Sequence, residues 1–267
     1  MRVIQLQMQV KETKDEGLKA LEASLEKIRD KQPDLVCIGE MFHCPYETSS
    51  FPVYAEKEGG ESWQFLSNLA KKYGIYLSAG TMPEVDDNGK VYNTAYVFDR
   101  EGRQIAKHRK AYLFDVDIKG GQYFKESDTL TAGDSCTVFD TEFGKIGICI
   151  CFDLRFPELS RMMVQRGAKV ILVPAAFNRT TGPAHWELLF RARAVDNQCF
   201  YLGTSTARNE QADYVAWGHS LCVSPWGEIL GELGAEEGIL ESDLDLEQVE
   251  RIRSELPLLA ALRTDIR

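Results

Sequence analysis

The sequence turns abruptly from apolar to polar across Gly147-Ile148-Cys149-Ile150-Cys151-Phe152-Asp153. An apolar run of this length is typical of a buried strand. Cys151 falls at the end of the run, and Pro157 soon afterwards marks a helix start, because proline is favoured at the first helical position. A side chain between a strand and a helix can be reachable while its backbone is held rigidly. Cys151 is therefore a candidate reactive thiol, with a buried structural cysteine as the alternative; Cys149, inside the strand, is expected to be structural.

Short strands and amphipathic helices alternate outward from this stretch in both directions. Strands are predicted near 3–10, 34–38, 75–79, 92–98, 103–109, 137–140, 145–151, 170–173, 200–204, 220–224, 229–233 and 239–243, and helices near 18–28, 63–73, 157–167, 182–198 and from 246 onward. There is no Gly/Ser linker and no internal repeat, so one α/β domain over residues 1–267 is the economical interpretation. This many strands favours two stacked sheets with outer helices over a single doubly wound sheet.

The bulk composition excludes several classes of partner. Hydrophobic residues make up 44% and charged residues 27% of the 267 residues, and the formal net charge is −10. An acidic surface repels nucleic-acid phosphates and anionic membranes, so neither is an expected partner. No secretory signal and no apolar run of the ~20 residues needed to span a bilayer is visible. The seven cysteines include no CxxC pair, which fits reduced thiols and a cytoplasmic location.

A nucleophilic thiol needs a base beside it or a lowered pKa. The four histidines each have another explanation from their position, for example His185 at a helix start and His219 at a strand start. Glu40 stands at the end of an apolar strand, where a carboxylate is costly to bury without a partner or a function. Lys110 also ends a strand. Taken singly, each of these two charges could be an ordinary surface residue.

Three separated motifs together resemble the carbon–nitrogen hydrolase (nitrilase-like) superfamily. They are Gly39-Glu40-Met41-Phe42, Arg109-Lys110-Ala111-Tyr112-Leu113-Phe114-Asp115 and Cys149-Ile150-Cys151-Phe152-Asp153-Leu154-Arg155-Phe156-Pro157-Glu158. The resemblance runs from about Val3 to Leu256. It implies a Glu–Lys–Cys triad of Glu40, Lys110 and Cys151, and Glu126 matches the supporting carboxylate of the family.

Further stretches resemble the ω-amidase branch of this superfamily. They are 177–189, 194–198, Tyr214-Val215-Ala216-Trp217-Gly218-His219-Ser220 and Pro225-Trp226-Gly227-Glu228. The resemblance implies a four-layer α-β-β-α sandwich, a homodimer or larger homo-oligomer, and hydrolysis of the terminal amide of small dicarboxylic monoamides such as 2-oxoglutaramate and succinamate. Deaminated-glutathione amidases share the catalytic motifs but resemble 214–220 less, and nitrilases resemble the chain less still outside the triad.

The resemblance also implies a mechanism. Cys151 attacks the amide carbonyl while Glu40 accepts its proton, and Lys110 with the backbone N–H of Phe152 stabilises the oxyanion. Glu126 positions Lys110 and the incoming amide or water; without the resemblance it would be an exposed loop charge. No motif implies a metal or an organic cofactor.

An anionic substrate tail requires a cation or hydrogen-bond donors. Arg155 suits a carboxylate well, but it could equally bridge Asp153 or Glu158 in a structural role. The remaining pocket candidates, which come from loops after strands, are Tyr46, Phe114, Asn178, Thr180 and Thr181. Tyr46 and Phe114 could instead be core aromatics, and Trp217 and Trp226 are expected to serve packing or an interface. The glycine-containing stretch 119–122 is a candidate for part of a lid.

Two other classes of protein remain as alternatives. A non-catalytic scaffold or ligand-binding subunit would be signalled by loss of a triad residue, and all three are present. A metal- or nucleotide-binding α/β protein would carry a P-loop, a GxGxxG after a strand or a His/Cys cluster, and none of these occurs.

Overall fold

A computed structural model describes residues 1–117, 123–263 and 265 of the chain. The proposed lid stretch 119–122 lies outside the described residues. The strands form two large sheets and one small hairpin.

The first sheet has seven strands. Its spatial order is β15 (Gly238–Asp243), β1 (Arg2–Gln7), β2 (Leu35–Ile38), β3 (Tyr76–Ser78), β5 (Val91–Phe98) and β4 (Met82–Val85), and β6 (Gln104–Arg109) also pairs with β5. β1, β2 and β3 are parallel, and the other pairings are antiparallel.

The second sheet has six strands. They are, in spatial order, β14 (Ile229–Glu232), β13 (Leu221–Val223), β12 (Phe200–Ser205), β11 (Val170–Ala175), β10 (Gly144–Ile148) and β9 (Thr137–Thr141). Here β10, β11 and β12 form the parallel centre. The separate hairpin pairs β7 (Asp115–Asp117) with β8 (Tyr123–Lys125).

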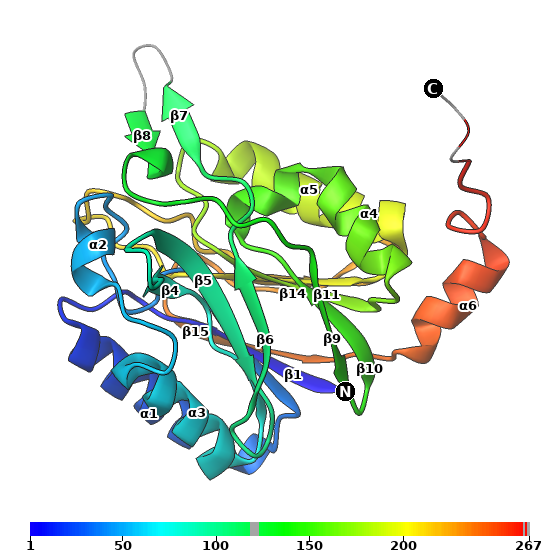
Figure 1. Ribbon diagram of the computed structural model, residues 1–267. Helices are drawn as coiled ribbons and strands as arrows, with labels where there is room; N and C mark the ends of the chain where they lie inside the picture. The colour runs from blue at the N-terminus through cyan, green and yellow to red at the C-terminus, as the bar shows by residue number, and fades with distance from the viewer. Residues whose placement is uncertain (118–122, 264, 266–267) are drawn as a thin grey trace.

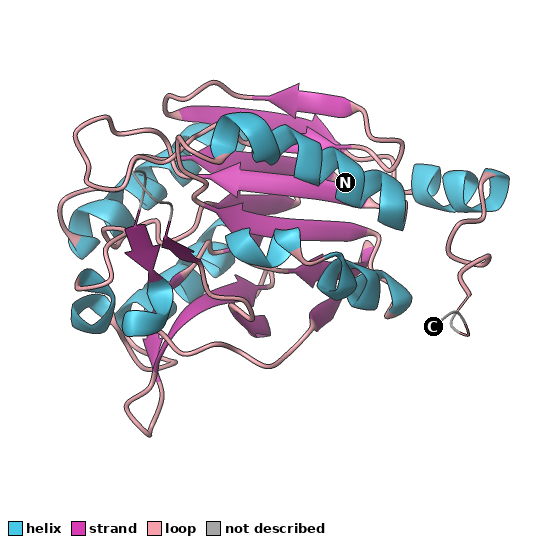
Figure 2. Cartoon of the chain, turned by 90° about the horizontal axis from the view of Figure 1, so that it is seen from above, coloured by secondary structure: helices cyan, strands magenta, loops and turns pink. Residues whose placement is uncertain are grey.

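Each parallel centre requires crossover connections, and helices provide them. Helices α1 (Lys14–Ile28) and α3 (Glu61–Tyr73) join the strands of the first sheet, and α4 (Pro157–Gln165) and α5 (Gly182–Asn197) join those of the second. Figures 1 and 2 show that each helix pair covers the outer face of its own sheet. The predicted α-β-β-α sandwich is therefore confirmed. Short α2 (Ser50–Tyr54) lies after β2, and α6 (Glu247–Glu255) extends from one side with the C-terminus.

The apolar periodicity of the helices accounts for the outer layers. In α1, Leu18, Leu21, Leu25 and Ile28 are buried against the first sheet, and a capping box between Thr13 and Glu16 starts the helix. A second core cluster joins the inner faces of both sheets with α4 and α5. Cys149 is fully buried in this cluster, as expected.

Polar side chains also cross between the two sheets. Gln5 of β1 is fully buried, and its amide donates to the Gly203 carbonyl at 2.8 Å and the Leu221 carbonyl at 3.2 Å in the second sheet. Alternation along β1 thus does not mark one face as solvent-exposed. Both faces are buried, and the glutamines satisfy backbone groups of the facing sheet.

The sheets approach each other closely beside the end of β2. A Cβ built on Gly39 would lie 2.7 Å from the Thr206 backbone nitrogen and 2.8 Å from the Ser205 carbonyl carbon. Only glycine fits there, because backbone atoms cannot move aside as a flexible side chain can. The position immediately before Glu40 is therefore set by contact with the other sheet.

Gly39→Ala should lower the free energy of unfolding by about 1–3 kcal/mol, since the added methyl overpacks this contact. The matched control is Gly234→Ala, because a Cβ there meets no heavy atom within 4 Å. Urea unfolding of both variants measures the difference. Equal stability of the two variants would contradict the close approach.

Candidate active site

Four buried functional side chains meet where strands end. Glu40 follows β2, Lys110 follows β6, and Cys151 begins a 3-10 turn (Cys151–Arg155) after β10. Glu126 begins another short turn after β8. Glu40, Lys110 and Glu126 are fully buried, and Cys151 is 5% exposed. The fold thus brings together residues separated by up to 111 positions, from Glu40 to Cys151.

Lys110 lies between two carboxylates. Its Nζ is 2.9 Å from Glu40 Oε1 and 2.9 Å from Glu126 Oε1. Burial alone would lower the pKa of Lys110, but Glu126 and Glu40 outweigh it and raise that pKa. The ammonium therefore stays charged through the neutral pH range, which suits the predicted oxyanion-stabilising role.

Tyr46 completes the cluster. Its hydroxyl donates to Glu126 Oε1 at 2.7 Å, lies 3.0 Å from Glu40 Oε1, and accepts from Lys110 Nζ at 3.3 Å. Burial raises the pKa of Glu126, although Lys110 opposes the shift. A raised pKa moves Glu126 towards its neutral form, which reduces the net negative charge of the cluster.

Two further donors orient the carboxylates. The Asn93 amide donates to Glu40 Oε1 at 2.7 Å, and the Phe114 backbone N–H donates to Glu126 Oε2 at 2.7 Å. Glu40 Oε2 is buried and has no hydrogen-bond partner among the described residues. Oε1 is therefore the Glu40 oxygen that the surrounding side chains hold in place. Asn93 carried no signal in the sequence, because it lies inside an ordinary strand pattern.

Cys151 has an uncommon backbone conformation, with φ at 44°. Met41, next to Glu40, has φ at 51°. Non-glycine residues rarely occupy the left-handed region, and such strain clusters at functional sites. The 3-10 turn begins at Cys151 itself, whereas the preceding strand was predicted to include this residue.

The thiol is held in its protonated form. Burial and then Glu40 raise the pKa of Cys151 well above its usual value, whereas Lys110 and the backbone N–H of Ala176 act in the opposite direction. A protonated thiol needs a base at the moment of attack, and Glu40 is the carboxylate beside it.

Because its pKa is raised, alkylation of Cys151 by iodoacetamide should still accelerate as the pH increases to 9. An ordinary thiol levels off near its pKa of ~8.5. Peptide mapping of the labelled protein, with Cys151→Ala as control, measures the rate at this residue. A plateau below pH 8 would instead indicate a thiolate paired with Lys110.

Asp153 ties the Cys151 turn to the segment after Lys110. Its Oδ1 accepts from the backbone N–H groups of Ala111 at 3.1 Å and Tyr112 at 2.8 Å. Its Oδ2 accepts from the Ile150 N–H at 2.9 Å and lies 3.0 Å from His108 Nε2. The carboxylate is fully buried, so it fixes the two loops relative to each other.

Asp153→Asn should lower the free energy of unfolding by about 2–4 kcal/mol, because an amide NH₂ then faces backbone donors. Displacement of the two loops should also reduce kcat on the order of 10- to 100-fold. Asp140→Asn, at an exposed position of β9, is the matched control. Thermal unfolding and steady-state kinetics measure both effects. Unchanged kcat in the folded Asp153→Asn variant would show that the hydrogen bonds of Asp153 do not set the geometry of the site.

A small cavity opens beside Cys151. Its other lining residues are Phe114, Phe152, Arg155, Phe177, Thr181 and Tyr214. Arg155 forms no ion pair with Asp153 or Glu158 in the described part of the chain, and the two Asp153 oxygens are occupied as stated above. The structural alternative for Arg155 is therefore not what is observed. Its guanidinium instead lies over the rings of Phe152 and Phe177, at 5.5 and 4.8 Å from their centroids.

Of the remaining pocket candidates, only Phe114 and Thr181 line this cavity. Asn178 is buried and its Oδ1 accepts from the backbone N–H groups of Thr180 and Thr181, at 3.0 and 2.9 Å, so it shapes the turn before α5. Thr181 reaches the cavity, whereas Thr180 is exposed and does not line it. Tyr46 belongs to the ion cluster rather than to this cavity.

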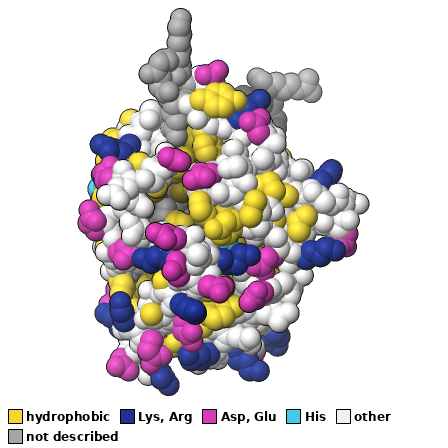
Figure 3. All heavy atoms as spheres, turned by 90° about the vertical axis from the view of Figure 1, so that its left-hand side faces the viewer, with side chains coloured by type: hydrophobic (Ala, Val, Ile, Leu, Met, Phe, Trp, Pro, Cys, Tyr) yellow, Lys and Arg dark blue, Asp and Glu magenta, His cyan; other side chains and the backbone are white. Residues whose placement is uncertain are grey.

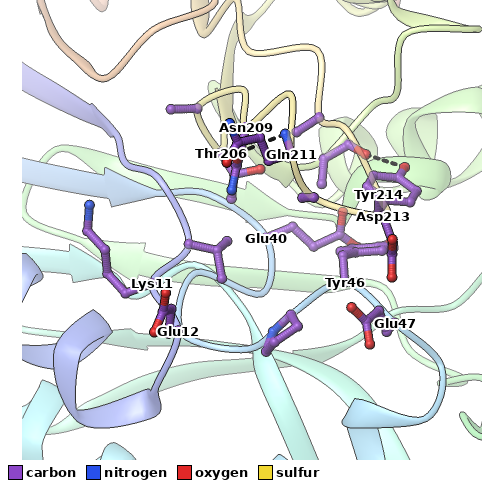
Figure 4. A pocket seen from close by; sticks show the side chains of 16 residues that line it. Lys11, Glu12, Glu40, Tyr46, Glu47, Thr206, Asn209, Gln211, Asp213 and Tyr214 are labelled. Carbon is purple, nitrogen blue, oxygen red and sulfur yellow. Dashed lines mark hydrogen bonds between the residues drawn. The ribbon is translucent and has the colours of Figure 1, made fainter.

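A larger cavity also has Tyr214 in its lining (Figure 4). Its lining includes Glu40, Tyr46, Ala176 and Tyr214 and, nearer the surface, Glu12, Glu47, Asn209 and Asp213. The Tyr214 hydroxyl donates to the Ala176 carbonyl at 2.6 Å, and its ring lies 4.4 Å from that of Tyr46. Tyr214 thus lines both cavities. Its stretch resembled the ω-amidase branch in sequence, but its place at the site was not predicted.

Figure 3 shows one face of the molecule, on the left-hand side of Figure 1. Hydrophobic side chains gather in its middle and upper parts, and acidic and basic side chains are mixed below them.

Within residues 1–117, 123–263 and 265, no group of three or more His, Cys, Asp or Glu side chains is arranged to hold a metal ion. Among these same residues, none of the helices has the length and apolar composition required to cross a bilayer.

The carbon–nitrogen hydrolase family model matches residues 1–254. The chain therefore belongs to the carbon–nitrogen hydrolase family. It is 48% identical to mouse omega-amidase NIT2 and 45% identical to the human protein, each over 265 residues that cover 99% of this chain and 96% of the relative. The predicted family is confirmed, and the chain is a hydrolase that acts on amides.

Solved structures give the same result. Nit3 of Saccharomyces cerevisiae, a member of branch 10 of the nitrilase superfamily, superposes with a TM-score of 0.91 at 40% identity, covering 100% of this chain and 97% of that one. An amidase from Nesterenkonia sp. AN1, whose active-site cysteine has reacted with acrylamide, gives a TM-score of 0.80 at 25% identity, covering 96% and 98%.

Proposed function

We propose that this protein is an ω-amidase that hydrolyses the terminal amide of small dicarboxylic monoamides, such as 2-oxoglutaramate and succinamate, to the acid and ammonia. The observation that carries the proposal is Arg155, a partly buried cation without a carboxylate partner among the described residues, in the same small cavity as Cys151. A carboxylate at the far end of the substrate compensates that charge. The omega-amidase relatives support the same substrate class.

Acylation begins when Glu40 takes the proton of Cys151 and the sulfur attacks the amide carbonyl. Glu40 is suited to this transfer because its Oε2 is free while Oε1 is held by Lys110 and Asn93. The tetrahedral intermediate collapses when Glu40 returns the proton to the amide nitrogen. The carbon–nitrogen bond breaks, ammonia leaves, and a thioester remains on Cys151.

Lys110 and the backbone N–H of Phe152 stabilise the oxyanion in both half-reactions. Loss of one such donor costs roughly 3–4 kcal/mol of transition-state stabilisation. Glu126 holds Lys110 in place, and Glu40 then activates the water that releases the acid. No step calls for a cofactor.

The acyl tail enters at the small cavity, whose lining has to move apart to hold it, because the space there is about that of one water molecule. Phe114, Phe152 and Phe177 contact its methylene groups, and Arg155 binds its carboxylate with Thr181 at the start of α5. A helix N-terminus adds favourable potential for an anion. The small size of the cavity favours a short tail over a peptide-like one.

Ammonia release from succinamate, deaminated glutathione and a small aliphatic nitrile tests this function. Succinamate should be turned over selectively, and Cys151→Ala should abolish turnover while the far-UV circular dichroism spectrum stays unchanged. Turnover of deaminated glutathione alone would indicate a deaminated-glutathione amidase, and turnover of the nitrile alone would indicate a nitrilase. Absence of turnover on all three would contradict the proposed substrate class.

We further propose a homodimer or larger homo-oligomer formed through the outer face of α5. Leu188, Val195 and Trp226 are 63%, 43% and 57% exposed and lie around one hollow. Large apolar side chains grouped on a surface favour association.

The core shared by both sheets supports a single domain over 1–267, and unpaired cysteines throughout support a cytoplasmic location.

Light scattering during size-exclusion chromatography should give a multiple of the chain mass for the wild type. Leu188→Glu with Val195→Glu should reduce it to one chain, because buried charges oppose association. Val53→Glu, 78% exposed on α2, is the matched control and should leave the assembly intact. A monomeric wild type would contradict the proposal.

A further inference from the structure

We propose that His185 is a positioning residue, whose imidazole holds the Arg155 guanidinium at the cavity beside Cys151 and so sets the preference for amides that carry a terminal carboxylate. This inference rests on the proposed function, because it concerns how the substrate carboxylate is recognised. It assigns a role to a histidine that the sequence pattern marked only as part of a helix start.

Hydrogen bonds from Arg193 fix the backbone at Leu154 and Arg155. Arg193, buried on α5, donates from Nε to the Leu154 carbonyl at 3.0 Å and from Nη2 to the Arg155 carbonyl at 3.1 Å. The Arg155 guanidinium lies over the rings of Phe152 and Phe177, at 5.5 and 4.8 Å from their centroids. Aromatic faces attract a guanidinium, but they fix neither its orientation nor how far it extends into the cavity.

His185 supplies the directed contact. Arg155 Nη1 lies 3.1 Å from His185 Nδ1, and Arg155 Nε is buried without a hydrogen-bond partner in the described chain. A guanidinium can only donate, so Nδ1 must accept through its lone pair. The imidazole in this contact is therefore neutral, with its proton on Nε2.

A neutral acceptor matters for the charge of the site. A carboxylate in place of His185 would also orient Arg155, but it would cancel the positive charge that the substrate requires. His185 fixes the guanidinium and leaves its full charge uncompensated. The site is thus pre-organised for an anion without being occupied by one of its own side chains.

The start of α5 places the imidazole. The His185 backbone N–H donates to the Thr181 carbonyl at 2.9 Å, in the first turn of the helix, and Thr181 itself lines the cavity. The Asn178 side chain orders the turn that precedes this helix. Arg155 and Thr181 are therefore held in one arrangement by the same helix end.

The test compares succinamate with succinamide, which has the same length but a neutral amide in place of the carboxylate. His185→Ala should raise KM for succinamate about 3- to 10-fold, which is the effect of losing one hydrogen bond. KM for succinamide and kcat for both substrates should change less than about 2-fold. His185→Gln, whose amide oxygen accepts, should restore most of the loss, whereas His185→Glu should raise KM for succinamate more than His185→Ala does.

A double-mutant cycle shows whether the effect passes through Arg155. In an Arg155→Gln background, His185→Ala should have no further effect on the succinamate-to-succinamide ratio of KM. The matched control is Glu158→Gln, an exposed carboxylate near Arg155 in sequence that forms no ion pair with it in the described chain. This variant should behave as the wild type.

Two outcomes overturn the inference. One is an unchanged KM ratio in His185→Ala, and the other is an equal loss in the Arg155→Gln background. Both are distinct from failure of the proposed function, in which the wild type itself would not hydrolyse succinamate or would not prefer it over succinamide.

Discussion

The structure of the site depends on one buried lysine. Lys110 is fully buried between Glu40 and Glu126, and an unpaired ammonium in that place would be far too costly to keep. Each carboxylate in turn is anchored by an additional donor from another element, Asn93 for Glu40 and Phe114 for Glu126. The ion cluster is thus a network in which one ammonium pairs with two carboxylates, and Glu40 Oε2 has no hydrogen-bond partner among the described residues.

The topology of the sandwich makes this network possible. Two parallel strand centres, each covered by its crossover helices, direct the ends of β2 and β10 to a common region. Asp153 then joins the turn that carries Cys151 to the segment that follows Lys110. Cys151, Glu40 and Lys110 follow different strands, so their distances are set by strand packing and by a few buried hydrogen bonds rather than by local sequence.

Much of this arrangement could be predicted from the sequence. The helices that follow a clear apolar period, such as α1 and α3, and the long strand β5 are where they were expected. The family motifs predicted the sandwich and a common site for Glu40, Lys110 and Glu126, whereas Tyr46 was expected in the substrate pocket or the core. The short strands β4, β7 and β8 and helix α2 were missed, because three to five residues carry too little periodicity to be recognised. The strand predicted over 145–151 ends at Ile148, because the backbone leaves the sheet before the apolar run of the sequence ends.

The parts of the site that were missed are those that depend on tertiary contacts. Asn93 lies within a strand and His185 within a helix, and neither position has a local feature that distinguishes it from its neighbours. Tyr214 belongs to a loop whose course over Tyr46 and Ala176 follows from contacts across the molecule. The competing roles of Arg155 could be separated only by the coordinates, which give it an imidazole and two aromatic rings instead of a carboxylate.

The most direct measurement of the central claim is the mass of the protein quenched during turnover of succinamate. The account predicts a population that has gained one succinyl group, located on Cys151 by peptide mapping and removed by neutral hydroxylamine, as a thioester is. An acyl group on another residue, or ammonia release with no acylated protein at any quench time and with Cys151→Ala still active, would contradict it.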